Sequence, residues 1–174
     1  KDSYLKEFTA TVIDVNKNDA GEAVFIVLDQ TAFYPTSGGQ PHDTGTLTKD
    51  GKAYHVIFVG NVSHQIEHSG LQQGDIVYGK IDWERRYMLQ RMHTACHVLS
   101  SIFIKEAGAL ITGNQLGIDQ SRIDFSLDNF DREKIQQYID KANHALFTNQ
   151  DVEVSFMPRT EAEKIPELSK LAMG

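Results

Sequence analysis

The sequence has one cysteine, Cys96, among its 174 residues. A single cysteine excludes an internal disulfide and is typical of a protein from a reducing compartment. It also excludes a zinc site built from several cysteines of this sequence. The seven histidines are therefore the main supply of metal ligands.

Long hydrophobic runs are also absent. No window approaches the roughly 18 to 20 consecutive apolar residues that a membrane-spanning helix needs. Residues 1–7 lack the basic and then apolar pattern of a secretory signal peptide. We therefore expect a soluble, cytoplasmic protein that does not act at a membrane. The first residue is lysine rather than methionine, which indicates a processed or trimmed product.

Positive charge is scarce overall, because the net charge is −7 at neutral pH. This balance disfavours non-specific binding to nucleic acid, which depends on lysine and arginine neutralising phosphates. A local basic face is still compatible with it. The densest positive stretch consists of Arg85, Arg86 and Arg91.

The first eighty or so residues predict a small β-barrel or sandwich. Short apolar or alternating runs are separated by turn residues such as Gly, Asp and Asn, and several such strands with regular turns are typical of these folds. The predicted strands are residues 8–15, 23–28, 54–59 and 75–83.

A long helix is predicted at residues 84–107, which contain no glycine or proline and have apolar residues at helical spacing. Gly108 is a suitable stop signal. Beyond it the pattern predicts strands at 111–116, 121–127 and 152–157, a helix from the cap Asp131 to about Asn149, and a short last helix capped by Thr160. The predicted fold class is α+β, with a small β-barrel-like domain over residues 1–82 and an α/β two-layer domain over residues 83–174.

Two histidines, His93 and His97, stand four residues apart on the predicted helix. Residues at this spacing share one face, with Cβ atoms about 5–6 Å apart, so both rings can reach one metal ion at Zn–N distances of about 2.0–2.1 Å. Ordinary surface or core histidines are the alternative interpretation. Catalytic zinc normally has three protein ligands. Cys96 is the third candidate by its chemistry, but it lies about 100° around the helix from His97, and otherwise the third ligand comes from elsewhere.

A second histidine pair, His64 and His68, belongs to a segment of strand and turn character. We interpret this segment as an exposed β segment. A metal site there is the less favoured alternative.

A glycine-rich loop has Ser37, Gly38, Gly39 and Gln40 at its centre. Paired glycines allow positive φ and a close approach of the backbone to a ligand. The loop lacks the lysine and the spacing of a nucleotide-binding P-loop. A structural β-turn is the alternative interpretation.

Two long motifs together resemble one known family. Residues 28–45 (LDQTAFYPTSGGQPHDTG) are followed by residues 81–86 (IDWERR) and residues 92–99 (MHTACHVL). In this order they resemble the editing region of alanyl-tRNA synthetase and, more closely, the free-standing AlaX-type trans-editing proteins that have an N-terminal β domain. The resemblance spans nearly the whole chain.

The resemblance implies a zinc-dependent site that hydrolyses the ester joining serine or glycine to the tRNA for alanine. It implies His93 and His97 as zinc ligands, together with a later Cys-x3-His pair, and Gln115 as a catalytic-site residue near the substrate. Cys96 stands where the synthetase version usually has threonine and is a second candidate for the catalytic site. The Cys-x3-His pair is expected beyond Gly174. We therefore expect either a trimmed product or an incomplete site with weak or absent zinc binding and weakened activity.

The expected partner is the acceptor end of tRNA(Ala), with Arg85, Arg86 and Arg91 near its phosphates. A solvated helix face with Glu84 as a partner is the alternative for these arginines. Two other functions stay open. One is an editing domain of the threonyl-tRNA synthetase type, which shares a His-x3-His helix, and the other is a tRNA-binding module without catalysis. The Ser37–Gln40 loop and the N-terminal β domain favour the alanine branch.

Overall fold

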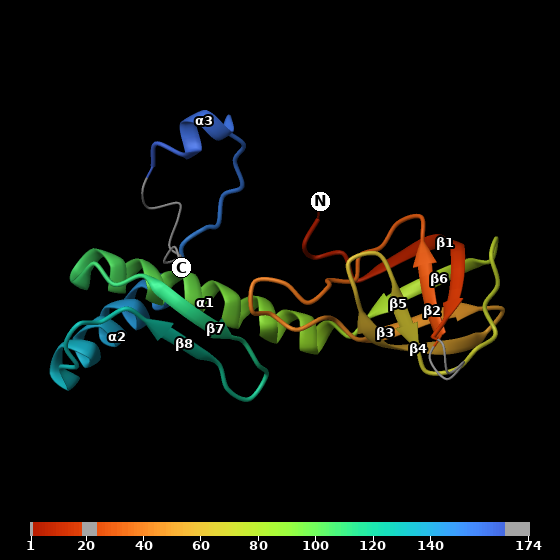
Figure 1. Ribbon diagram of the computed structural model, residues 1–174, viewed down its shortest axis with the longest axis horizontal. Helices are drawn as coiled ribbons and strands as arrows, with labels where there is room; N and C mark the ends of the chain where they lie inside the picture. Colours follow the sequence, from red (N-terminus) through yellow and green to blue (C-terminus); the bar gives the residue numbers. More distant parts are fainter. Residues whose placement is uncertain (1, 19–23, 166–174) are drawn as a thin grey trace. The chain divides into compact units, whose positions relative to one another are not determined.

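The computed structural model describes residues 2–18 and 24–165 (Figure 1). The chain divides into two compact units, Lys1–Gln90 and Arg91–Gly174. The division falls inside the helix α1 (Trp83–Ala107), so the first turns of this helix belong to the first unit and the remainder to the second. None of the described helices is long and apolar enough to cross a membrane.

The first unit contains a closed antiparallel barrel with the strand order β1-β2-β5-β4-β3-β6. It confirms the barrel that the sequence predicts. The strands are β1 (Glu7–Lys17), β2 (Val24–Leu28), β3 (Gly45–Lys49), β4 (Lys52–Val59), β5 (His64–Ile66) and β6 (Ile76–Ile81). Only β3 falls outside the β segments that the sequence indicated, because its five residues, GTLTK, include a single large apolar side chain.

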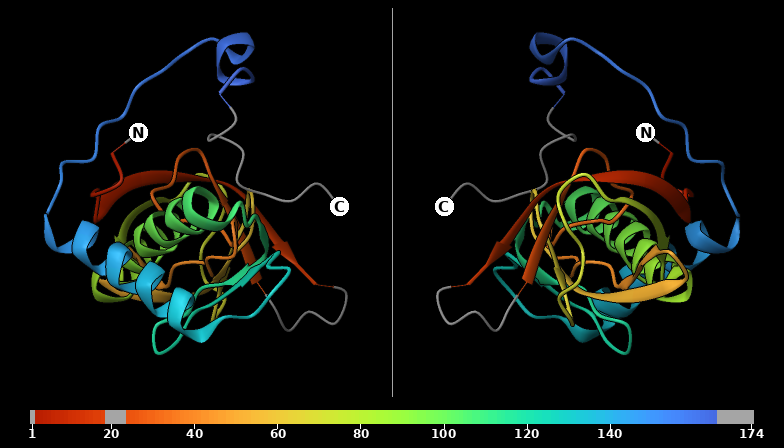
Figure 2. Two further views of the ribbon diagram at one scale, coloured as in Figure 1. Left: turned by 90° about the vertical axis from the view of Figure 1, so that its left-hand side faces the viewer. Right: turned by 90° about the vertical axis from the view of Figure 1, so that its right-hand side faces the viewer.

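Barrel closure depends on the long strand β1, which arches across the barrel (Figure 2). Its first half pairs with β6, from Glu7 opposite Lys80 to Thr11 opposite Ile76. Its second half pairs with β2, and a bulge lies between Val12 and Asp14. A bulge bends its strand and increases the local twist, which lets one strand hydrogen-bond two neighbours and close the sheet.

Alternation along the strands fills the barrel with apolar side chains. In β2 the buried positions are Val24, Ile26 and Leu28, and β6 buries Val77 and Ile81. Side chains two residues apart point to the same face of a strand, so each strand contributes one inward row. Ile26, Leu47 and Val77 are completely buried.

The interpretation of residues 64–68 as an exposed β segment is wrong for His64, which is buried in the barrel. Its Nδ1–H donates to the Ile26 carbonyl at 3.2 Å, since a carbonyl can only accept, and its Nε2 accepts from the Thr31 hydroxyl at 2.8 Å. His68 is exposed and lies beyond the end of β5. His64 is therefore a hydrogen-bonded core histidine, and the described residues offer no metal site that joins it to His68.

The second unit packs α1, a hairpin and a second helix around Phe103. Its further elements are β7 (Ile111–Gln115), β8 (Arg122–Phe125), α2 (Arg132–Phe147) and α3 (Arg159–Ala162). The Phe103 ring stacks on Phe125 of β8, with centroids 4.2 Å apart, and meets Tyr138 of α2 edge-on at 5.3 Å. Because α1, β8 and α2 each contribute one ring, this aromatic cluster fixes their packing.

Two predicted helix boundaries are confirmed, and two predictions near residue 155 are wrong. Gly108 follows α1 with φ of 65°, the left-handed conformation that ends many helices. Asp131 caps α2 by accepting from the backbone N–H groups of Glu133 and Lys134. Residues 152–157 are exposed and form no strand, since an alternating pattern yields a strand only where a partner satisfies its backbone. The cap position of α3 is Pro158 rather than Thr160, with no side-chain hydrogen bond.

Burial lowers the pKa of His64, which makes the stability of the fold dependent on pH. The unfolded chain binds a proton at His64 below about pH 6.5, whereas the folded chain resists it. The stabilisation is therefore complete above about pH 6.5 and is lost as the pH falls through the lower pKa of the folded state. We expect the free energy of unfolding, measured with urea and far-UV circular dichroism, to fall between pH 7.5 and pH 5.

In His64→Gln this fall becomes shallower, because Gln does not titrate. The exposed His68→Gln variant is the matched control and should keep the wild-type slope. The same slope in all three proteins would contradict the assignment.

Candidate functional site

The rings of His93 and His97 lie side by side on α1 in the second unit. Their centroids are 5.0 Å apart and their planes differ by 8°. This arrangement follows from the four-residue spacing, which places both side chains on one face of the helix. The two imidazoles are thus brought together by their spacing along α1 alone.

Helical periodicity explains why the two rings differ in burial. The buried positions along α1 include Leu89, Cys96, Ser100 and Phe103, which lie seven, four and three residues apart and so share one face. His93 lies within this stripe and is half-buried, and His97 lies one position beyond it and is exposed. Burial lowers the pKa of His93, so its ring is neutral at pH 7 and keeps one nitrogen unprotonated. Neutral imidazole is the form that binds a metal ion.

The donor set fits part of a zinc site. Two adjacent imidazoles supply two nitrogen ligands of the type that zinc prefers. Cys96 does not complete the set, because it is buried on the inner side of α1 at 5% exposure. In the part of the chain that the structure describes, no group of three or more His, Cys, Asp or Glu side chains could hold a metal ion. Among the described residues, the histidine pair therefore offers two of the ligands that a zinc ion would need.

Gln115, another predicted site residue of the second unit, lies at the end of β7. It pairs in register with Arg122 of β8 and is exposed. Its amide is accessible to a ligand, on a different element from the histidines.

The Ser37–Gln40 segment of the first unit is a tight turn. Ser37 and Gln40 exchange two backbone hydrogen bonds of 3.0 and 2.9 Å. Gly38 and Gly39 between them have φ of 60° and 78°. Positive φ at both central residues is the signature of a type I′ turn, which glycine adopts without strain. The structure thus gives these glycines the structural role that the sequence left as an alternative.

Asp43 closes the loop around this turn. Its carboxylate accepts from the backbone N–H of Tyr34 at 2.6 Å, and its own N–H donates to the Tyr34 carbonyl at 3.0 Å. The Asp43 side chain is completely buried. A buried carboxylate needs a charged partner, and that partner is Arg86.

Arg86 forms a buried ion pair with Asp43 that the sequence interpretation missed. Its Nε donates to both carboxylate oxygens at 2.9 Å, and its Nη2 donates to Asp43 and to the Ala32 carbonyl. Arg86 is 5% exposed. The structure therefore corrects the assignment of Arg86 to a phosphate-binding face, and also the alternative of a solvated face beside Glu84. The signal in the sequence was its position three residues before Leu89, on the inward side of the helix.

The other two arginines differ from Arg86. Arg85 is half-buried and donates from Nε and Nη2 to the His42 carbonyl at 3.3 and 3.1 Å. Arg91 is exposed on α1 in the second unit. Arg91 is therefore the exposed one of the three arginines.

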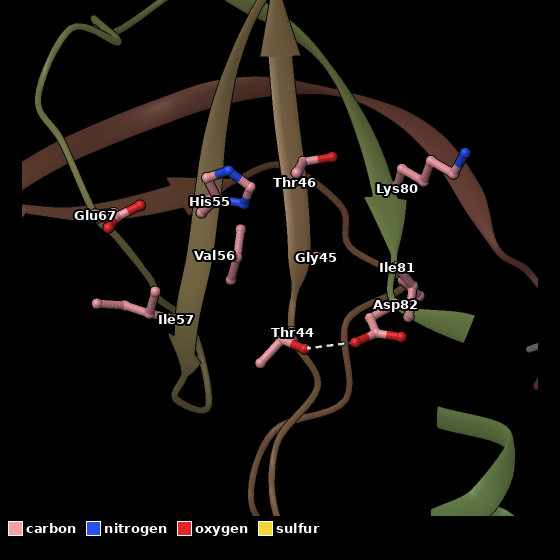
Figure 3. A pocket seen from close by; sticks show the side chains of 10 residues that line it. All are labelled: Thr44, Gly45, Thr46, His55, Val56, Ile57, Glu67, Lys80, Ile81 and Asp82. Carbon is pink, nitrogen blue, oxygen red and sulfur yellow. Dashed lines mark hydrogen bonds between the residues drawn. The ribbon is translucent and has the colours of Figure 1, made fainter. Parts of the chain in front are cut away.

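An open groove of about 580 Å³ lies on the first unit, along β3, β4 and the end of β6 (Figure 3). Its lining mixes apolar, acidic, basic and hydroxyl side chains, and the Thr44 hydroxyl donates to Asp82 at 3.3 Å. The sequence gave no sign of it, because the residues come from separate segments. They are Thr44, Gly45, Thr46, His55, Val56, Ile57, Glu67, Lys80, Ile81 and Asp82.

The sequence is similar to those of known proteins. Residues 4–85 match the family model of class II (A) tRNA synthetases. The alanyl-tRNA editing protein AlaX-M of Methanosarcina mazei is 50% identical over 99% of this chain and 72% of its own length. The chain belongs to the AlaX-M family of alanyl-tRNA editing proteins. The AlaX-M protein of Saccharolobus solfataricus is 37% identical over the same shares. The alanine–tRNA ligase of Pyrococcus furiosus is 38% identical over 94% of this chain and 18% of the ligase.

The stability of the chain should depend on the buried Arg86–Asp43 ion pair. Asp43→Ala leaves the Arg86 charge buried without its carboxylate, and breaking a buried pair in this way costs about 3–5 kcal/mol. We expect a loss of that size in the free energy of unfolding, measured by denaturant titration. The matched control is Arg159→Ala, which breaks the exposed Arg159–Glu163 pair and should change stability by less than about 1 kcal/mol. Equal losses in the two variants would contradict the account.

Proposed function

We propose that this chain is an aminoacyl-tRNA deacylase that hydrolyses seryl- or glycyl-tRNA(Ala), in which the tRNA for alanine carries the wrong amino acid. The likeness to AlaX-M proteins over 99% of the chain carries this proposal. The two side-by-side imidazoles on α1 add a chemical reason for placing the site in the second unit. Relatives that are alanine–tRNA ligases favour the alanine branch over the threonine branch.

We propose Zn²⁺ as the cofactor, with His93 and His97 as two of its ligands. Bound zinc would lower the pKa of a coordinated water and polarise the ester carbonyl. His93 suits this role because burial already keeps its ring neutral at pH 7. The stacked geometry also means that neither ring has to change its helix face to meet a common cation.

We propose that the other residues of the site bind and orient the aminoacyl-tRNA. The exposed amide of Gln115 offers a neutral donor and acceptor to a polar substrate group. Arg91, and the part of Arg85 that remains accessible, supply positive charge for phosphates of the acceptor end. Cys96 is buried on the inner side of α1, so the proposed substrate contacts do not include its thiol.

Selectivity is the first test of the proposal. Serine differs from alanine by one hydroxyl, and glycine lacks only a methyl group, so size alone separates them poorly. We expect seryl- or glycyl-tRNA(Ala) to be hydrolysed faster than alanyl-tRNA(Ala) by roughly 10- to 200-fold, the range that one small group supplies. The measurement is release of labelled amino acid from the three charged tRNAs. Equal turnover of all three would remove the editing assignment, and binding without hydrolysis would favour a non-catalytic module.

Metal content tests the histidine pair separately from activity. In a preparation that holds zinc, replacing both His93 and His97 by alanine should abolish the bound metal, measured by elemental analysis. Deacylation should fall by more than the roughly 10- to 100-fold that loss of an outer-shell partner costs. His144→Ala, which removes an exposed histidine of α2, is the control and should keep its zinc. Stoichiometric zinc in the double variant would show that other residues bind the metal.

A further inference from the structure

Four side chains form a stack on the surface of the first unit, at the start of α1. The centroid of the Trp83 ring lies 5.8 Å from that of Tyr4 and 5.7 Å from that of Tyr87. The planes of the Trp83 and Tyr87 rings are nearly parallel, with an angle of 22° between them. The Lys6 ammonium lies over the Trp83 ring, 4.6 Å from its centroid. We name these residues, Tyr4, Lys6, Trp83 and Tyr87, the aromatic stack.

The backbone around the aromatic stack is fixed by hydrogen bonds. The Ser3 carbonyl accepts from Gln90 Nε2 at 2.9 Å and from Arg86 Nη1 at 3.4 Å. The Lys6 carbonyl accepts from the Ile81 N–H at 2.9 Å. Trp83 and Tyr87 are four residues apart on α1 and therefore share a face. The rings are thus held in place before any partner arrives.

The outer rings of the stack are open to solvent. Tyr4 is 64% exposed and Tyr87 is 44% exposed, whereas Trp83 between them is half-buried. Exposed, pre-positioned aromatic rings beside a cation are the combination with which proteins bind unpaired nucleotides, since the rings stack on bases and the cation neutralises a phosphate. A base inside a duplex does not present its face to such a ring, because the neighbouring base pairs cover both of its faces.

We propose that the aromatic stack binds an unpaired base of the tRNA, with the base on the outer face of Tyr4 or Tyr87 and Lys6 near the adjoining phosphate. The net charge of −7 makes this contact useful, because phosphate neutralisation alone is weak for an acidic chain. Stacking supplies affinity that does not depend on net charge. The inference rests on the proposed function for the identity of the RNA, but binding of uncharged tRNA tests it without any turnover.

Tryptophan fluorescence monitors the aromatic stack directly, because Trp83 is the single tryptophan of the sequence. Titration of the protein with uncharged tRNA(Ala) should change the Trp83 emission as a base joins the stack. The Tyr4→Ala/Tyr87→Ala variant should bind the tRNA more weakly by roughly 5- to 150-fold, the range for loss of one base–aromatic stack, as measured by filter binding. Tyr78→Ala removes a tyrosine of β6 with the same 44% exposure as Tyr87. This control should bind like the wild type.

Three RNA probes identify the source of the base. A blunt-ended duplex of two complementary RNA strands contains no unpaired base and should leave the Trp83 emission unchanged. A single-stranded oligonucleotide with the tRNA 3′ end competes if the acceptor end supplies the base, and an oligonucleotide with a tRNA loop competes if a loop does. Equal binding of the wild type and the double tyrosine variant would overturn the inference even if deacylation were observed. A tyrosine-dependent binding signal without deacylation would sustain the inference and defeat the proposed function.

Discussion

The buried ion pair between Arg86 and Asp43 joins three segments of the first unit that are distant in sequence. Arg86 belongs to α1, Asp43 closes the glycine-rich loop, and the same guanidinium also bonds to the carbonyls of Ala32 and Ser3. Burying two charges is costly, and the cost is offset only where every polar atom finds a partner. Here the backbone N–H of Tyr34 completes the shell of the carboxylate. The network also positions two neighbouring segments. Arg86 bonds to Ser3, which precedes Tyr4 of the aromatic stack, and Asp43 bonds to Tyr34, which precedes the Gly-Gly turn.

The helix α1 contributes buried side chains to both units, at positions three or four residues apart along the helix. In the first unit its inward positions are Arg86 and Leu89, and in the second they are Cys96, Ser100 and Phe103. The spacing of three and four residues places half-buried His93 within the buried stripe and exposed His97 outside it. One imidazole is thereby held neutral by burial while the other stays accessible. The two proposed zinc ligands thereby combine a fixed position on the helix with access to a ligand.

Local patterns in the sequence predicted what depends on local structure. The barrel strands other than β3, α1 with its stop at Gly108, the Asp131 cap and the four-residue histidine spacing all follow from neighbours in the chain. Local patterns do not predict contacts between residues that are distant in the sequence. The residues next to His64 do not indicate that Ile26 and Thr31 bond to its ring. Likewise, the residues next to Arg86 do not indicate that it pairs with Asp43. The alternation at residues 152–157 failed for the same reason, because a strand needs a partner elsewhere. Similarity to AlaX-M proteins supplied the function, which the geometry of two imidazoles alone does not specify.

The central claim is that a mischarged aminoacyl ester binds at His93 and His97. Nitrogen-15 NMR of the seven imidazole rings, with a non-hydrolysable amide analogue of 3′-seryl-adenosine as the ligand, tests it most directly. Binding of the ligand at this pair should shift the signals of His93 and His97 and leave that of buried His64 unchanged. Binding that leaves both helix histidines unchanged would contradict the claim.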